Sequence, residues 1–281
     1  MSDRKRAVRS ACNAPIGRPL TSILMVAVAG AALLAHCPAM ANADIEHYVG
    51  TAYDASGRVL YTESHWISGT LPRRELTVLF RCPDGAPFAR KHVVEAGVAQ
   101  APSFTLEDAR TGYREGVRDG TGGSREVFTR SVEGQLEKRA LLKSAPDLVV
   151  DAGFDSFIRD HWDALATGAP QHVEFLVPSR LRTYPFTLSL VDDELMDGKP
   201  VRRFLMELDT WYGFAIPSIV LFYAADTRTI REYRGIANVR DSTGKSLDVR
   251  IEFREDHRAT TGESMTLSDA RTARLDGACV L

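Results

Sequence analysis

The sequence predicts a mainly β, α+β protein, with an antiparallel, curved sheet or open half-barrel and one amphipathic helix packed across it. Three observations support this prediction. Apolar and polar residues alternate in several short segments, turn residues separate those segments, and only one segment has the clear 3.6-residue periodicity of an amphipathic helix. Because the strands follow one another without regular intervening helices, the pattern favours a meander over alternating βαβ units.

Segments in which every second residue is apolar are typical of half-buried strands. The clearest is LDVRIEF (247–253), in which four apolar residues alternate with charged ones. It follows the turn-like stretch RDSTGK (240–245), so we expect a hairpin there. The same alternation recurs elsewhere between turns rich in Gly, Asp and Pro. The alternating segments are 76–80, 173–177, 184–190 and 201–209, and the turns are 54–57, 83–85, 119–123 and 196–199.

One segment predicts a helix that covers the sheet. Residues 154–165 place apolar side chains at helical spacing, and His161 lies on the same stripe. Asp151 or Asp155 can cap the start of this helix. We interpret His161 as a core residue rather than as a ligand. A weaker periodicity predicts a second, short helix near 268–275.

The first 43 residues predict a signal peptide that is removed on export. A basic start precedes an apolar run at 23–35, which is shorter than the roughly 20 residues that span a bilayer. Two Ala-x-Ala sites allow cleavage after Ala41 or Ala43. His36 occupies a position where a lipobox requires a small residue, so we expect no lipid anchor at Cys37. These features predict a periplasmic protein.

Removal of the leader leaves residues 44–281, which we interpret as a single mature domain with a loosely ordered C-terminal segment from about 255 to 281. The leader holds five of the 35 Lys and Arg residues and one of the 37 Asp and Glu residues, so the mature chain is mildly acidic. This charge argues against a nucleic-acid partner, which requires clustered positive charge. No segment after the leader is apolar for long enough to predict a membrane span.

The mature chain retains two cysteines, Cys82 and Cys279. In an oxidising compartment a disulfide between them is the first interpretation, and it would enclose most of the mature chain. The alternative is two separate thiols, one buried and one in the tail. We predict no metal and no cofactor, because the histidines are scattered and the chain has no CxxC pair.

No sequence motif identifies a reaction. The chain has no GxSxG, HExxH or P-loop, and no GxGxxG follows a predicted strand. If LYTESHW (60–66) is a strand, Glu63 and His65 share a face, and the carboxylate could orient the imidazole as a general base. The alternative, which we favour, is that both side chains belong to the wet face of a sheet.

The apolar stretch DTWYGFAIPSIVLFY (209–223) has two interpretations. It either fills the core or lines a pocket for a lipid-sized ligand, since such pockets are mostly apolar with few polar groups. In the second interpretation the lining draws on five aromatic residues of the chain. These are Trp66, Trp162, Trp211, Phe214 and Phe222.

Alternating strands with aromatic residues fill the last third of the chain, from Tyr184 to Phe253, including YAADTRTIREYRGIANVRDSTGK (223–245). This pattern resembles the half-barrel carriers of bacterial lipoprotein sorting, in which an incomplete barrel lidded by helix holds acyl chains. Four other stretches carry a second resemblance: YVGTAYD (48–54), FRCPDG (80–85), VVDAGFDSF (149–157) and GIANVRD (235–241). In these stretches the chain is similar to uncharacterised exported proteins of Gram-negative bacteria, and that resemblance implies no activity.

These observations predict a periplasmic, non-enzymatic binder or carrier of an apolar or amphipathic, lipid-like ligand. One alternative is an envelope hydrolase that uses Glu63 and His65. The other is a structural or assembly partner of envelope proteins, which would bind through an exposed sheet edge.

Overall fold

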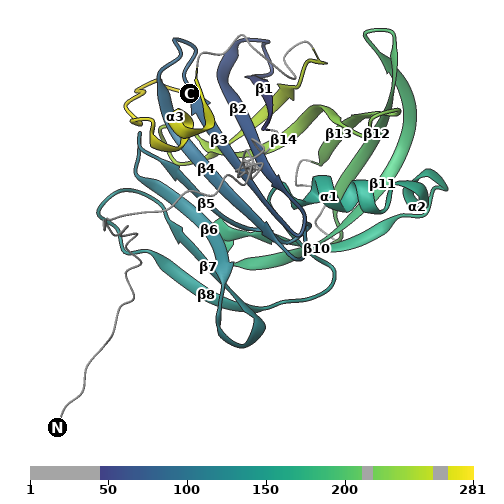
Figure 1. The fold of residues 1–281 in the computed structure, drawn as a ribbon, viewed down its shortest axis with the longest axis horizontal. Helices are drawn as coiled ribbons and strands as arrows, with labels where there is room; N and C mark the ends of the chain where they lie inside the picture. Colours follow the sequence, from purple (N-terminus) through teal and green to yellow (C-terminus); the bar gives the residue numbers. More distant parts are fainter. Residues whose placement is uncertain (1–44, 211–217, 256–264) are drawn as a thin grey trace, which may run out of the picture. The chain divides into compact units, whose positions relative to one another are not determined.

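The computed structural model describes residues 45–210, 218–255 and 265–281 (Figure 1). In these ranges fifteen strands form one curved sheet, and the helices are few and short. The predicted fold class is therefore confirmed. The strands are β1 (Glu46–Tyr53), β2 (Val59–Thr70), β3 (Arg73–Arg81), β4 (Pro87–Ala96), β5 (Ser103–Asp108), β6 (Tyr113–Asp119), β7 (Ser124–Arg130), β8 (Lys138–Lys143), β9 (Leu148–Val150), β10 (Gln171–Val177), β11 (Arg182–Met196), β12 (Lys199–Leu208), β13 (Ile219–Ala224), β14 (Ile230–Arg240) and β15 (Ser246–Glu252). The helices are α1 (Gly153–Asp160), α2 (Trp162–Ala166) and α3 (Leu267–Thr272), with 3₁₀ turns η1 (Thr121–Gly123) and η2 (Pro178–Arg180).

The order of the strands places the start of the chain in the middle of the sheet. From β1 the strands run outward to β8 on one side, and β15 back to β9 form the other side. The two halves meet where β1 pairs with β15, and every pair is antiparallel except β9 with β10. Strands β8 and β9 are the two ends of the sheet, and no hydrogen-bonded ladder joins them within the described residues.

Backbone and side-chain contacts join β9 and η2, in one half of the sheet, to β6, β7 and the β4–β5 loop in the other half. The turn η2 lies against β6 and β7. The amide of Val150 in β9 donates to the carbonyl of Gln100 at 3.0 Å, and the Gln100 side chain donates to the carbonyl of Pro146 at 2.9 Å. The sheet therefore curls until its two halves touch, without closing into a hydrogen-bonded barrel.

Two glycines permit close contacts between neighbouring strands, Gly50 on the cavity face of the sheet and Gly116 on the opposite face. A Cβ at Gly50 would lie 2.7 Å from the ring of Phe253, and one at Gly116 would lie 2.2 Å from the carbonyl oxygen of Phe104. Glycine in a strand is typical of such close approaches. Irregular pairing adds to the curvature, because the register shifts in five strand pairs and bulges bend a strand.

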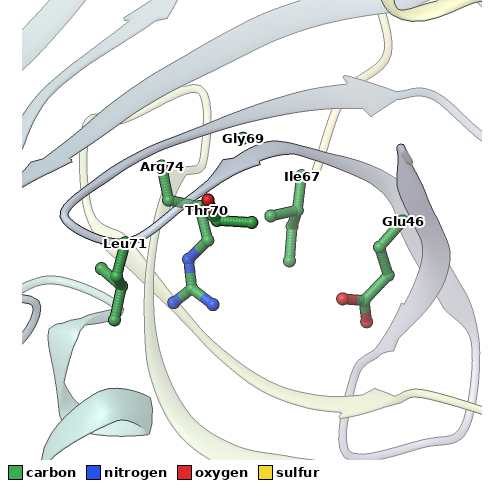
Figure 2. Close-up of a pocket in the computed structure, with 6 residues that line it drawn as sticks. All are labelled: Glu46, Ile67, Gly69, Thr70, Leu71 and Arg74. Atoms are coloured by element: carbon green, nitrogen blue, oxygen red, sulfur yellow. The ribbon is translucent and has the colours of Figure 1, made fainter. Parts of the chain in front are cut away.

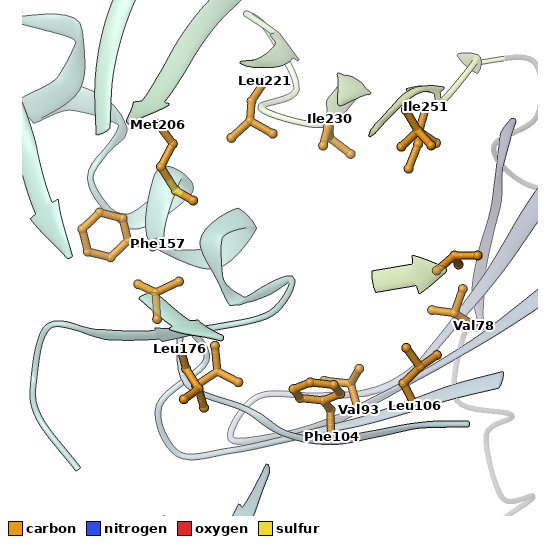
Figure 3. Close-up of a cluster of buried hydrophobic side chains, with 14 of the residues drawn as sticks. Val78, Val93, Phe104, Leu106, Phe157, Leu176, Met206, Leu221, Ile230 and Ile251 are labelled. Carbon is orange, nitrogen blue, oxygen red and sulfur yellow. The ribbon is translucent and has the colours of Figure 1, made fainter. Parts of the chain in front are cut away.

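The main core lies on the concave side of the sheet. Figure 3 shows buried side chains of distant strands, among them Val78, Val93, Ile230 and Ile251, arranged around a shared space. A second, smaller cluster lies on the opposite face, where α3 packs on β2 and β3. It consists of Trp66, Leu79, Leu267 and Ala270.

The predicted helix 154–165 is present but divides at His161. Helix α1 ends at Asp160 and α2 begins at Trp162, while His161 Nδ1 donates to the carbonyl of Phe157 at 2.9 Å. The prediction that Asp151 or Asp155 caps the helix is wrong, because Ala152 is the N-cap residue and no side chain caps it. Both carboxylates bind other side chains.

The structure describes Glu255 and residues 265–281 of the C-terminal segment for which we predicted loose order. Helix α3 begins with a capping box between Thr266 and Asp269. Beyond it, the amide of Gly277 donates to the carbonyl of Pro87 at 2.7 Å. Cys279 forms a disulfide with Cys82, in agreement with the first of the two interpretations, so covalent and packing contacts hold this segment against β3 and β4.

Candidate functional site

A cavity of about 930 Å³ lies on the concave side of the sheet. Its wall comes from most of the strands together with α1 and η2, because alternate residues of each strand face inward. The volume falls in the upper part of the roughly 300–1,000 Å³ range of small-molecule sites. Its apolar wall includes Tyr61, Phe80, Phe175, Tyr184, Phe186 and Phe253.

A smaller pocket of about 330 Å³ adjoins this cavity at the β2–β3 hairpin (Figure 2). It shares Glu46, Ile67 and Arg74 with the larger cavity. The guanidinium of Arg74 is held by two hydrogen bonds to the carboxylate of Glu95, at 2.7 Å and 3.0 Å. This pair raises the pKa of Arg74, so the cation is secured at this end of the cavity.

Helix α1 closes part of the cavity and is fixed at two carboxylates. Asp151, two residues before the helix, forms a buried ion pair with Lys91 of β4. Asp155 in the first turn accepts from the hydroxyl of Tyr223 at 3.0 Å and lies 2.7 Å from a guanidinium nitrogen of Arg159. The helix is thus attached to strands of both halves of the sheet.

Glu63 and His65 lie together in the cavity wall. Both line the cavity from β2, and His65 Nε2 lies 3.0 Å from Glu63 Oε1. The ring of Tyr48 stacks on the imidazole with centroids 4.4 Å apart, and Phe253 meets it edge-on at 5.8 Å. The second ring nitrogen, Nδ1, is buried without a hydrogen-bond partner among the described residues. The shared face that we predicted for this pair is therefore present, and it faces the cavity.

A second polar group surrounds the buried carboxylate of Glu115. Its oxygens accept from the hydroxyl of Tyr113 at 2.5 Å and from the side-chain amide of Asn238 at 2.7 Å. Arg240 in turn donates to the Tyr113 hydroxyl at 2.9 Å. Burial raises the pKa of Glu115 and outweighs the two hydrogen bonds, which act in the opposite direction. The group links β6 with the end of β14 across the cavity wall.

Comparisons with known proteins give a result for solved structures alone. No protein-family model matches the chain, and no curated protein matches it. Among solved structures, the chain is similar to a β-barrel-like protein of the domain of unknown function DUF1849 from Brucella abortus. The identity is 12%, the TM-score is 0.47, and the match covers 76% of this chain and 98% of the other.

Three of the five aromatic residues that we predicted as a ligand lining are described, and these three lie outside the described cavity lining. Trp66 packs in the cluster under α3, on the face of β2 opposite Glu63 and His65. Trp162 fills the core between Phe204 and Tyr223. Neither tryptophan belongs to the described residues that line the cavity.

Phe222 is also absent from the described lining of the cavity. It alternates with Leu221 and Tyr223, which face the main core, and the guanidinium of Arg234 lies over its ring at 4.8 Å. Trp211 and Phe214 lie outside the described residues. The aromatic wall that the structure does describe comes from shorter alternating segments, such as 184–190, whose period of two predicts two faces but not which of them is concave.

The described ranges contain no group of three or more His, Cys, Asp or Glu side chains that could hold a metal ion. Within the same ranges, none of the helices has the length and apolar character needed to cross a bilayer. The carboxylates in the cavity wall instead pair with nearby donors.

Proposed function

We propose that the protein is a periplasmic, non-enzymatic binder or carrier of an apolar or amphipathic, lipid-like ligand. The observation that carries this proposal is the 930 Å³ cavity, whose wall combines aromatic and aliphatic side chains with a limited set of ion pairs. A sequence that needed only a stable core would fill this space, because protein interiors are packed like organic crystals. A largely apolar wall around a space of this size suits an apolar or amphipathic ligand.

The polar groups in the wall are compatible with such a ligand because most of them are neutralised locally. Arg74 pairs with Glu95, Lys91 with Asp151, and Arg159 with Asp155. Paired charges cost less to cover with an apolar chain than isolated ones do. The space between them is therefore suited to hydrocarbon.

Two measurements test this proposal: the ligand that co-purifies with the protein, and the binding of an apolar probe by the delipidated protein. We expect native mass spectrometry of gently purified protein to detect a bound lipid-like mass, and the delipidated protein to bind the uncharged fluorescent probe N-phenyl-1-naphthylamine. The variant Ala237→Trp places an indole in the cavity wall and should abolish probe uptake. Val191→Trp on β11 is the matched control, because Val191 is 48% exposed and not among the described lining residues. Absence of both a bound mass and probe uptake in the wild type would overturn the proposal.

A second candidate function is an envelope hydrolase, which the contact between Glu63 and His65 favours. The carboxylate lies 3.0 Å from the imidazole inside the cavity, so it could hold His65 as a general base. Turnover of an ester substrate series by the wild type, lost in His65→Ala and retained in His92→Ala, would support it. Equal turnover in His65→Ala and wild type would contradict it.

The periplasmic location rests on the leader sequence. We expect the exported protein to begin at Asn42 or Asp44, without a lipid on Cys37, because cleavage after Ala41 or Ala43 discards that cysteine. N-terminal sequencing and intact mass of protein from the periplasmic fraction check this. A mature protein that begins at Cys37 would contradict it.

A further inference from the structure

The cations of the cavity wall differ in how they are bound, and Arg240, for example, forms no ion pair among the described residues but donates to the carbonyl of Gly244 and the hydroxyl of Tyr113. The carboxylates of Glu63, Glu95, Glu115, Asp151 and Asp155 all line the cavity, and each has a hydrogen-bond or ion-pair partner of its own. Arg180 and Arg182 line the same cavity, yet neither side chain has a hydrogen bond or ion pair with any described residue. The wall therefore carries uncompensated positive charge at this position.

The two arginines lie where the chain leaves η2 and enters β11. Both side chains are exposed, although they belong to the cavity lining, so they occupy its water-accessible rim. The guanidinium of Arg182 lies 4.3 Å from the centroid of the Tyr184 ring. This cation–π contact uses the flat face of the guanidinium and positions the Arg182 side chain. The N–H groups at the edge of the guanidinium remain available as donors.

An apolar wall continues directly from this cationic rim. Alternate residues of β11 face the cavity, so Arg182 is followed inward by Tyr184 and Phe186 over about 14 Å of strand. Phe175 of β10 pairs with Tyr184 in register and meets Phe186 edge-on at 5.8 Å. A single strand thus presents a cation at the rim and aromatic rings in the interior.

Lys245 also lines the cavity but has a different charge environment. Lys245 lies at the end of the β14–β15 turn, close to Asp241. The pKa of Asp241 is lowered first by a hydrogen bond from the Thr243 hydroxyl, then by one from the Lys245 amide, and also by the charge of Lys245. The ammonium is therefore already partly balanced by that carboxylate. Arg180 and Arg182 remain the cations best placed to receive an external anion.

From this arrangement we infer that the ligand is a single-chain amphiphile with an anionic head group, a carboxylate or phosphate. The inference rests on the proposed binding function. The head group binds Arg180 and Arg182 at the rim, and the chain lies along Tyr184 and Phe186. Exposed guanidinium groups suit this role because they bind carboxylate or phosphate through two parallel hydrogen bonds without first being buried alone.

The test uses four dodecyl probes below their critical micelle concentrations, measured by titration calorimetry with the full mature chain. The probes are dodecanoate, dodecyl phosphate, dodecyltrimethylammonium and dodecyl maltoside. We expect the two anions to bind at least about tenfold more tightly than the cation and the uncharged probe, with an advantage that shrinks at high salt.

The variant Arg180→Gln/Arg182→Gln should lose about tenfold in affinity for both anions and keep its affinity for dodecyl maltoside. The control Arg139→Gln/Arg274→Gln removes the same charge at exposed positions outside the described cavity lining and should bind like wild type. Equal affinity for anionic and uncharged probes, or equal losses in both variants, overturns the inference while the binding function stands. Failure of all four probes to bind overturns both proposals.

Discussion

The ammonium of Lys91 lies 3.0 Å and 2.9 Å from the two carboxylate oxygens of Asp151, and both residues are buried. The pair joins β4 to the turn that leads into α1, across 60 residues of sequence. Asp151 adopts a left-handed backbone conformation with φ of 49°, which directs the chain into the helix. This contact fixes the start of the helix that closes part of the cavity.

Removing one partner of this pair should be costly. Lys91→Met leaves the Asp151 carboxylate buried without its cation, and we expect it to lower the free energy of unfolding by about 3–5 kcal/mol. The double variant Lys91→Met/Asp151→Asn should recover much of the loss, since Asn carries no charge and tolerates a positive φ. Urea unfolding followed by tryptophan fluorescence measures both. As a surface comparison, Arg58→Met, which breaks an exposed pair with Asp54, should lower the free energy of unfolding far less than Lys91→Met does.

The raised pKa of Glu115 predicts how the stability of the protein depends on pH. Burial raises this pKa above the ordinary value of 4.5, so the folded protein binds this proton more tightly than the unfolded chain does. The contribution to stability is therefore present below pH 4.5 and is lost as the pH rises through the raised pKa. We expect the stability of Glu115→Gln relative to wild type to increase with pH over that window.

Thermal unfolding at a series of pH values checks this sign. Glu126 provides the opposite control, because its hydrogen bond with Arg118 lowers the pKa of that exposed carboxyl. The stability of Glu126→Gln relative to wild type should fall as the pH rises. A constant difference between Glu115→Gln and wild type across the range would contradict the role of burial.

Trp66 should affect stability without affecting the cavity. Its side chain is 3% exposed and lies under α3, with the guanidinium of Arg81 over the ring at 5.9 Å. We expect Trp66→Ala to cost about 3–5 kcal/mol because a large core side chain is removed. Uptake of N-phenyl-1-naphthylamine per folded molecule should match wild type. A loss of uptake with unchanged stability would place Trp66 in the ligand site after all.

The disulfide should stabilise the fold by restricting the unfolded chain. Cys82 and Cys279 are separated by 197 residues, and the chain-entropy model assigns a loop of that length about 5 kcal/mol. We expect Cys82→Ser/Cys279→Ser to unfold at lower urea, and the wild type to change its gel mobility on reduction. A free-thiol assay that finds two thiols in the unfolded, non-reduced protein would show that the pair is not formed.

The alternation of apolar residues predicted strands well where only local chemistry matters. Residues 247–252 of the stretch LDVRIEF lie in β15, and the turn before them joins β14 to β15 as a hairpin. The same alternation placed Glu63 and His65 on one face, and the structure brings them into contact. These relationships involve residues two positions apart, so the period of the strand is enough to predict them.

The lining of the cavity depends on longer-range relationships. Both faces of β2 are covered, one by the core and one by α3, so the apolar character of Trp66 could not reveal which face is concave. The partners Lys91 and Asp151 meet only because the sheet curls around α1. No sequence pattern marks Arg182, because an arginine at the start of a strand has no local feature that shows whether the fold gives it an anionic partner.

The open seam between β8 and β9 has a consequence for the size of ligand. In a closed barrel the number of strands and their stagger set the circumference. Here η2 and Gln100 join the two halves of the sheet, and no ladder joins β8 to β9 among the described residues. No strand pair therefore fixes the circumference of the sheet at this seam. Among the described residues, the contacts of η2 and Gln100 set the width of the interior, and with it the size of ligand that the proposed site would accept.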